Sequence, residues 1–227
     1  MRGINAKGLK RMKSKLYPAV LRVLEQVNRV ILGKDEKIRE IMTAFLANGH
    51  VLLEDIPGVG KTTLAVAFSR AMQLDYRRVQ FTPDVLPSDL TGFSVYRREE
   101  EKFVYQPGSV FCNLLVEAQR EIYQVYMKDV IYDYALKLVR ATRDHAVLER
   151  GASPRATIAL VQMAKAAAWM SGRDYVTPAD VSGQFSYVAA HRVSLSGAAR
   201  MGGRTKEGVL REVAETVEIP PMGEERR

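Results

Sequence analysis

The stretch His50-Val-Leu-Leu-Glu-Asp-Ile-Pro-Gly-Val-Gly-Lys-Thr-Thr63 decides the fold class of this chain of 227 residues. Its first five residues predict a short buried strand, and its glycines predict a tight loop. Apolar residues at helical spacing over Lys61–Met72 predict a helix directly after the loop. A polyphosphate is held by this order of strand, glycine-rich loop and helix, because backbone N–H groups and the helix N-terminus approach the phosphates. The sequence therefore predicts a nucleotide-binding loop in an α/β fold.

Two side chains of this loop have a predicted chemical role. Lys61 reaches the β- and γ-phosphates in such loops, and the Thr62 hydroxyl is a ligand of Mg²⁺. The pattern departs from the strict motif at Asp55, which takes the place of the first glycine, while Pro57-Gly58 still supplies the turn. An ordinary strand-to-helix turn is the alternative, but the flanking strand and helix favour the nucleotide loop. The predicted ATP contacts in the loop are Asp55, Ile56, Pro57, Gly58, Val59, Gly60, Lys61, Thr62 and Thr63.

The rest of the first half also alternates between helices and strands. Residues 19–46 predict two helices joined at Ile31-Leu32-Gly33, and the alternating charges of Lys34–Glu40 predict a solvated helix face. Arg78–Thr82 reads as a second strand, and Gly92–Tyr96 pairs with Lys102–Tyr105 in a predicted hairpin. A third strand begins at Asn113–Val116.

The second half is predicted to be helical down to Val193. Glu117–Met127, Val130–Arg143 and Ala156–Trp169 have helical periodicity, and Ser153-Pro154 and Thr177-Pro178 are typical helix starts. Tyr123, Tyr126 and Trp169 lie on apolar faces and are expected in the core. We therefore expect a basic N-terminal arm (1–18), a truncated αβα nucleotide-binding domain (19–116) and a helical lid domain (117–227).

Composition excludes several classes of protein. Cys112 is the single cysteine, which forbids an internal disulfide and fits a reducing cytoplasm, and no zinc-ligand spacing is present. The basic N-terminus lacks the apolar stretch of a signal peptide, and no run of about 18 apolar residues predicts a membrane span. The net charge of +8 raises nucleic-acid binding as an alternative, but without interleaved aromatic residues a solvated arm is favoured.

Several motifs resemble the MoxR-type AAA+ ATPases. They are the nucleotide loop Gly49–Thr63, the stretch Gln80-Phe-Thr-Pro-Asp-Val-Leu-Pro-Ser-Asp-Leu-Thr-Gly92, and the hairpin Phe103–Gly108 with Phe111. In the helical half, Gly151-Ala-Ser-Pro-Arg155 and Gly172–Val181 resemble the lid of that family. The likeness extends from about residue 20 to the end of the lid.

The resemblance implies further site residues. Arg155 would lie at the second position of a helix, where a cation opposes the helix dipole unless it serves an anion. The resemblance makes Arg155 the sensor-2 arginine, which contacts the γ-phosphate. It also places Ile31 and Gly33 in the backbone segment that packs on adenine, although by spacing alone they form a helix joint.

The resemblance also implies a function. It is that of a chaperone-like ATPase that forms a hexameric ring and uses ATP and Mg²⁺ to remodel protein partners, often proteins with a von Willebrand factor A domain. Such an enzyme needs a carboxylate on Mg²⁺, a group that orients water and an arginine finger. No Asp-Glu pair follows Val116, so no catalytic residue is identifiable, and about 90–100 residues of the family pattern are absent.

Three readings of the function stay open at this point. The first is the complete family activity, the second a nucleotide-binding remnant without turnover, and the third a basic nucleic-acid-binding AAA+ relative. The residues do not choose between a natural deletion, an engineered one and a segment omitted from the sequence. The missing segment is acidic in the family, so the charge of +8 reflects in part its absence.

Overall fold

The computed structural model describes residues 17–54, 56, 58–76, 78, 86, 88, 92–99, 101–107 and 121–221. The chain divides into two compact units, each of which is described by itself. The helical unit comprises Met1–Val20, Glu36–Leu52 and Val116–Arg227. The loop unit comprises Leu21–Asp35 and Leu53–Leu115 and contains the predicted phosphate loop.

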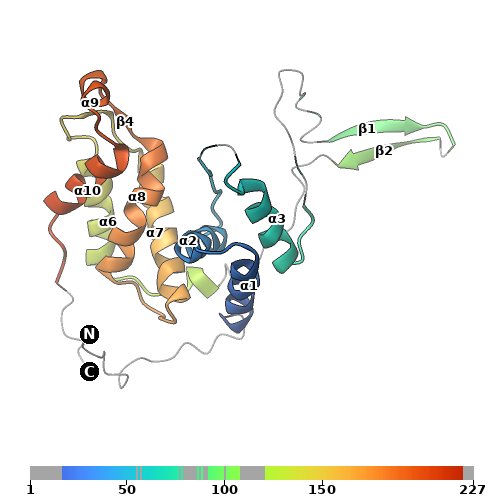
Figure 1. Cartoon of the computed structure of the whole chain (residues 1–227), viewed down its shortest axis with the longest axis horizontal. Coiled ribbons are helices and arrows are strands. Elements are labelled where there is room, and N and C mark those ends of the chain that lie inside the picture. The colour runs from blue at the N-terminus through green and yellow to red at the C-terminus, as the bar shows by residue number, and fades with distance from the viewer. Residues whose placement is uncertain are drawn as a thin grey trace. The chain divides into compact units, whose positions relative to one another are not determined.

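A bundle of helices forms the centre of the helical unit. Helix α7 (Pro154–Met170) packs against α6 (Asp129–Ala141) and α8 (Pro178–Ala189), and α10 (Lys206–Thr216) packs on α8 and α6 (Figure 1). Each helix turns an apolar stripe inward, as periodicity predicts. The largest fully buried side chains of the bundle are Trp169, Tyr134, Phe185, Ile131, Leu138, Leu160, Met170 and Leu210.

Smaller elements complete this unit and correct two predictions. The lid is not purely helical, because β3 (Leu148–Arg150) pairs antiparallel with β4 (Ser194–Leu195), and α9 (Gly197–Met201) follows η1 (Ala190–Arg192) and β4. The helix predicted over Glu117–Met127 is wrong in its second half. Only residues 121–123 are helical among those described there, and Tyr126 forms a bridge with Tyr175.

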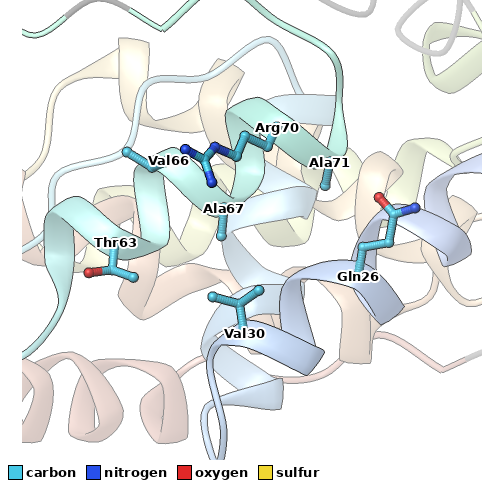
Figure 2. Close-up of a pocket in the computed structure, with 7 residues that line it drawn as sticks. All are labelled: Gln26, Val30, Thr63, Val66, Ala67, Arg70 and Ala71. Atoms are coloured by element: carbon cyan, nitrogen blue, oxygen red, sulfur yellow. The ribbon is translucent and has the colours of Figure 1, made fainter.

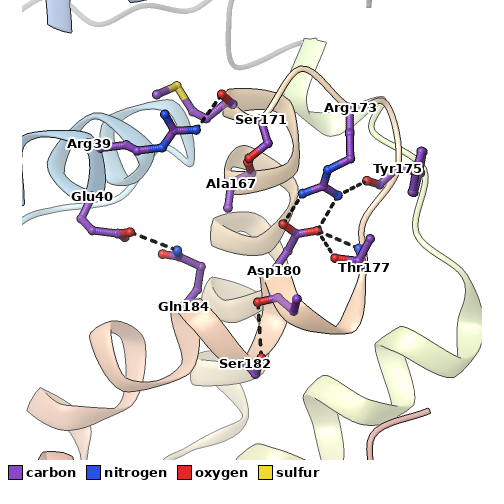
Figure 3. Close-up of polar contacts among 12 residues, drawn as sticks. Arg39, Glu40, Ala167, Ser171, Arg173, Tyr175, Thr177, Asp180, Ser182 and Gln184 are labelled. Carbon is purple, nitrogen blue, oxygen red and sulfur yellow. Dashed lines mark hydrogen bonds and ion pairs between the residues drawn. The ribbon is translucent and has the colours of Figure 1, made fainter. Parts of the chain in front are cut away.

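Helix α2 (Asp35–Leu46) lies almost wholly in the helical unit and is tied to it by polar side chains. The guanidinium of Arg39 donates to the Met170 carbonyl (2.9 Å), and Gln184 donates to Glu40 (3.5 Å; Figure 3). Lys37 lies over the ring of Tyr187. The predicted solvated face of residues 34–40 is confirmed for Lys34–Lys37 and for Arg39, which are exposed, whereas Glu40 is only half-exposed.

Among the residues that the structure describes, the loop unit contains most of α1, the helix α3 and a hairpin. The predicted pair of helices around residues 31–33 is confirmed, with α1 (Tyr17–Val30) ending where Ile31 N–H donates to the Val27 carbonyl, and α2 beginning at Asp35. Helix α3 (Lys61–Ala71) is confirmed as well. The predicted hairpin is present as β1 (Gly92–Arg97) and β2 (Lys102–Pro107), with Val95 opposite Val104 and Tyr96 opposite Phe103.

The strand predicted at His50–Glu54 is wrong. These residues form no strand, and Leu52 and Leu53 are 66% and 39% exposed. A strand needs a neighbour to take up its N–H and C=O groups, and within the described residues only β1–β2 and β3–β4 pair as strands. Arg78 is likewise outside any strand, while residues 79–82 and the predicted strand Asn113–Val116 lie outside the described residues.

None of the helices in the described part of the chain has both the length and the apolar character that a membrane crossing requires.

Candidate functional site

The predicted phosphate loop leads directly into α3. Gly58 and Gly60 have φ angles of +88° and +87°, which only glycine adopts without strain, and a Cβ on either would meet no atom within 4 Å. Gly60 is the N-cap of α3, and its carbonyl accepts from the Leu64 N–H (2.9 Å). The glycines therefore set the backbone geometry of an open loop at a helix N-terminus.

The start of α3 suits an anion. The first turn of the helix carries no acidic residue, and the side chains of Thr62 and Thr63 are exposed there. The unpaired N–H groups of a first helical turn and the helix dipole both favour negative charge. The ammonium group of Lys61 donates to the Ile56 carbonyl (3.2 Å), which keeps this cation against its own loop.

A second lysine reaches the loop from another part of the sequence. The Lys34 ammonium donates to the Val59 carbonyl at 3.3 Å, and both residues belong to the loop unit. Lys34 follows Gly33, whose φ of +72° turns the chain at the end of α1. Sequence reasoning missed this contact because Lys34 sits in a run of alternating charges, and no local pattern indicates a partner 25 residues away.

The loop fits a nucleotide polyphosphate with magnesium. Its left-handed glycines, its cation and its acid-free helix start fit the phosphates, and the Thr62 hydroxyl offers one protein ligand to the metal. Mg²⁺ commonly takes the rest of its ligands from phosphate oxygens, water and one or two carboxylates. No cluster of three or more His, Cys, Asp or Glu side chains that could hold a metal occurs in the described residues.

The other predicted ATP contacts lie partly inside and partly outside the described residues. Asp55 and Pro57 lie outside the described residues. Ile31 and Gly33 form the turn after α1, in the same unit as the loop, and Val59 of the loop is bonded to the next residue of that turn, Lys34. The turn predicted to face adenine and the loop predicted to face phosphate are therefore joined by a hydrogen bond.

A cavity of about 220 Å³ lies between α1 and α3 but does not match a phosphate site (Figure 2). Val30 of α1 and Val66 and Ala67 of α3 make its walls largely apolar, and its one cationic side chain is Arg70. Sites for small molecules usually measure about 300–1,000 Å³ and include placed polar groups. We interpret this space as loose packing between the two helices.

Arg155 belongs to the helical unit and stands at the start of α7. Ser153 is the N-cap residue and Pro154 takes the first helical position, so the predicted helix start is confirmed, although the Ser153 hydroxyl makes no capping bond. The Arg155 side chain is exposed, and the first turn of α7 holds no acid. An exposed cation at this end of a helix is available to an anion.

The residues before α7 explain the Gly-Ala-Ser-Pro-Arg motif. A Cβ on Gly151 would lie 2.6 Å from the Thr142 carbonyl oxygen, so only glycine fits against the end of α6. The buried Thr142 hydroxyl accepts from the Ala152 N–H (2.9 Å), and Arg143 donates to the Ala152 carbonyl (2.9 Å). These contacts fix where α7 begins and therefore where Arg155 stands.

The Gly172–Val181 motif is held by a buried ion pair (Figure 3). Arg173 bonds both oxygens of Asp180 (2.7 and 2.5 Å), and the same carboxylate accepts from the N–H and the hydroxyl of Thr177, both at 2.7 Å. The bond to Asp180 raises the pKa of Arg173 further above its ordinary value. This motif is structural, because it fixes the start of α8 and leaves no donor set open to a ligand.

Comparison with known sequences agrees with this geometry. Residues 50–128 match the ATPase family associated with various cellular activities (AAA), and residues 140–213 match the AAA lid domain. YeaC of Bacillus subtilis is 28% identical over 90% of this chain and 96% of its own length. Chaperone MoxR1 of Mycobacterium tuberculosis is 25% identical over 88% of this chain and 82% of its own.

The length of these alignments bears on the missing segment. The alignment with YeaC runs over 307 positions, and the whole chain has 227 residues, so at least 80 aligned positions have no residue in this chain. The alignment with chaperone MoxR1 runs over 310 positions. The inference that part of the family pattern is absent therefore agrees with both relatives.

One further relative supports the family, and one solved structure supports the fold. Protein MoxR of Methylorubrum extorquens is 38% identical over 40% of this chain and 26% of its own length. A crystal structure from Cytophaga hutchinsonii superposes with a TM-score of 0.79 at 22% identity, covering 90% of this chain and 96% of that one, and shows the same fold. Both the nucleotide-binding and the lid patterns are present, and relatives named MoxR match. The chain belongs to the MoxR-type AAA+ ATPases.

Proposed function

We propose that the loop unit binds ATP with Mg²⁺, and that this chain acts as a subunit of an oligomeric, cytoplasmic assembly that remodels protein partners. The observation that carries nucleotide binding is the loop itself, with its left-handed glycines, its acid-free helix start and the cation of Lys61. The match to chaperone MoxR1 supports the remodelling role. We also propose that the subunits form a ring and that the partner proteins contain a von Willebrand factor A domain.

The residues have distinct parts in the proposed binding. The N–H groups of Gly58–Thr63 would surround the β- and γ-phosphates, Lys61 would move from the Ile56 carbonyl to a phosphate oxygen, and Thr62 would hold the metal. When bound, Mg²⁺ neutralises charge on the phosphates. Ile31 and Gly33 are proposed for adenine, and Arg155 for the γ-phosphate.

Binding without hydrolysis is the second candidate function. At least 80 positions of the alignment with YeaC have no counterpart here, and the described residues include no acid cluster for a metal. An ATPase needs a carboxylate on the metal and a group that orients the attacking water. Nucleic-acid binding remains the third candidate only through the net charge of +8, and salt-dependent retention on DNA would be its test.

The test of nucleotide binding is a titration with a fluorescent ATP analogue, with Lys61→Ala as the variant and Lys137→Ala as the control. Lys137 is an exposed residue of α6, far from the loop in sequence. Lys61→Ala should lose most of the affinity because it removes the cation built into the loop, and Lys137→Ala should bind like the parent. Unchanged affinity in Lys61→Ala would contradict the assignment of the phosphate loop.

Hydrolysis is tested separately by phosphate release from a preparation whose intact mass is measured first. At 25.5 kDa, we expect binding without release above background. Release from such a preparation, abolished by Lys61→Ala, would favour the complete ATPase activity over binding alone. A substantially larger mass would show that the protein contains the missing segment, and ATP turnover would then be expected.

A further inference from the structure

Lys34 has no role in the binding described so far, although it is bonded to the phosphate loop. It lies outside the loop and α3, on the turn between α1 and α2, and its ammonium donates to the Val59 carbonyl at 3.3 Å. The Lys61–Ile56 bond joins two residues five apart and closes the loop on itself, whereas the Lys34–Val59 bond joins segments 25 residues apart. Lys34 therefore attaches the loop to a segment outside it.

The loop has a physical need for such an attachment. Gly58 and Gly60 flank Val59, and glycine loses more conformational freedom on ordering than any other residue. A loop that must align several N–H groups on one phosphate group binds more tightly when it is ordered beforehand, because less entropy is then lost on binding. The hydrogen bond to the Val59 carbonyl, between the two glycines, therefore restrains the backbone where it has the most conformational freedom.

The end of α1 holds Lys34 in place for this contact. Helix α1 ends at Val30, the Ile31 N–H still donates to the Val27 carbonyl (2.9 Å), and the left-handed Gly33 then redirects the chain. Both Val27 and the neighbouring Leu24 are buried, so the helix that carries the turn is anchored in a core. The turn that carries Lys34 therefore follows a helix with a buried face, whereas the loop that it contacts contains two conformationally free glycines.

We infer that Lys34 is a positioning residue, which orders the phosphate loop through the Val59 carbonyl before a nucleoside polyphosphate binds. The inference rests on the proposed nucleotide function of the loop. It assigns Lys34 the role of a donor to the backbone, and no contact with phosphate. A donor without charge at this position should therefore serve almost as well as lysine.

The experiment compares Lys34→Ala, which removes the donor, with Lys34→Gln, which keeps a donor and removes the charge. Lys137→Ala serves as the control for loss of an exposed lysine. In the nucleotide-free protein, ¹⁵N relaxation should show order parameters of Gly58 and Gly60 that fall in Lys34→Ala and stay near the parent in Lys34→Gln. Affinity for ATP should fall about two- to tenfold in Lys34→Ala, the range expected for one hydrogen bond, and stay within twofold of the parent in Lys34→Gln.

Two outcomes would overturn the inference. If Lys34→Gln loses as much affinity as Lys34→Ala while its loop stays ordered, the charge of Lys34 contacts phosphate and the backbone role is wrong. If the loop of Lys34→Ala is as ordered as that of the parent, the hydrogen bond to Val59 does not order the loop and the inference is wrong. A parent that binds no ATP, together with a loop that loosens in Lys34→Ala, would refute the proposed function and leave the positioning role standing.

Discussion

The helical unit and the loop unit differ in how completely they bury their apolar residues. In the helical unit, Leu160 and Trp169 are fully excluded from solvent. In the loop unit, Leu53 and Ile56 are exposed, and the hairpin leaves Phe103 open to solvent although its ring lies 5.2 Å from that of Tyr96. Of the largest fully buried side chains among the described residues, all but Val27 belong to the helical unit, although that unit also exposes Ile158 and Met201.

The difference follows from how the two kinds of element satisfy their backbone. A helix bonds its own N–H and C=O groups, so α6, α7 and α8 need only each other's apolar faces to complete a bundle. A strand must pair with a neighbour, and His50–Glu54 finds none within the described residues. The absence of part of the family pattern therefore affects a sheet, whose strands need neighbours, more than a helical bundle, whose helices satisfy their own backbone groups.

The largest expected effect separates the two units by matched substitutions. Leu160→Ala should destabilise the helical unit by about 2–5 kcal/mol, because a fully buried leucine leaves a cavity, whereas Leu53→Ala should cost less than about 1 kcal/mol. Urea unfolding followed by the fluorescence of Trp169, the single tryptophan, measures the helical unit. Equal shifts in the two variants would mean that Leu53 shares in the same core.

A second substitution tests whether the helical unit depends on its buried ion pair. Asp180→Ala should cost about 2–4 kcal/mol, since it leaves Arg173 without its partner and frees the N–H of Thr177. Glu212→Ala is the matched control, because its pair with Arg204 is exposed and is worth about 0–1 kcal/mol. Thermal melts of both variants give the comparison, and a cost for Asp180→Ala no greater than that of the control would assign the stability to packing alone.

A third substitution asks whether the helical unit contributes to nucleotide binding. If Arg155 contacts the γ-phosphate, Arg155→Ala should weaken ATP about ten- to a hundredfold, equivalent to about 1.5–3 kcal/mol, and leave ADP nearly unchanged. Calorimetric titration with each nucleotide measures the two affinities. Equal affinities for both, in a variant that melts no lower than the parent because its helix N-terminus has lost a cation, would make Arg155 a solvated residue.

The smallest expected effect concerns the seam between α2 and α8. Burial raises the pKa of Glu40 above its ordinary value of 4.5, and Glu36 adds to this, against Gln184, Arg39 and Lys37, which lower it. The folded state therefore holds this proton more tightly than the unfolded chain, so the contribution of Glu40 to stability is greatest at low pH and falls as the pH rises from about 4.5 through the raised pKa.

Glu40→Gln should remove this pH dependence and stabilise the helical unit slightly at pH 7, by up to about 1 kcal/mol. One oxygen of Glu40 and the amide oxygen of Gln184 are buried without a hydrogen-bond partner, and a glutamine at position 40 could donate to the latter. Urea midpoints at pH 5 and pH 7 measure the change. A variant with the same pH slope as the parent would show that other groups produce it.

The sequence by itself determined the elements whose signals are local. Gly58 and Gly60 specified the turn that leads into α3, Ser153-Pro154 and Thr177-Pro178 specified helix starts, and the segments Gly92–Tyr96 and Lys102–Tyr105 specified the hairpin. Each depends on backbone conformation or on side chains within a few residues. The position of Trp169 in the core was predictable in the same way, from its place on an apolar helical face.

Only the tertiary structure decided the features that depend on distant partners. Tyr123 and Tyr126, expected in the core, are 55% and 60% exposed, and His50–Glu54 has the composition of a strand without being one. Lys34 and Glu40 belong to a run of alternating charges, and nothing in that run predicts their hydrogen bonds to Val59 and Gln184. A local pattern records what a segment is able to form, while burial and hydrogen bonding depend on which other segments lie within reach, and that is fixed only when the chain folds.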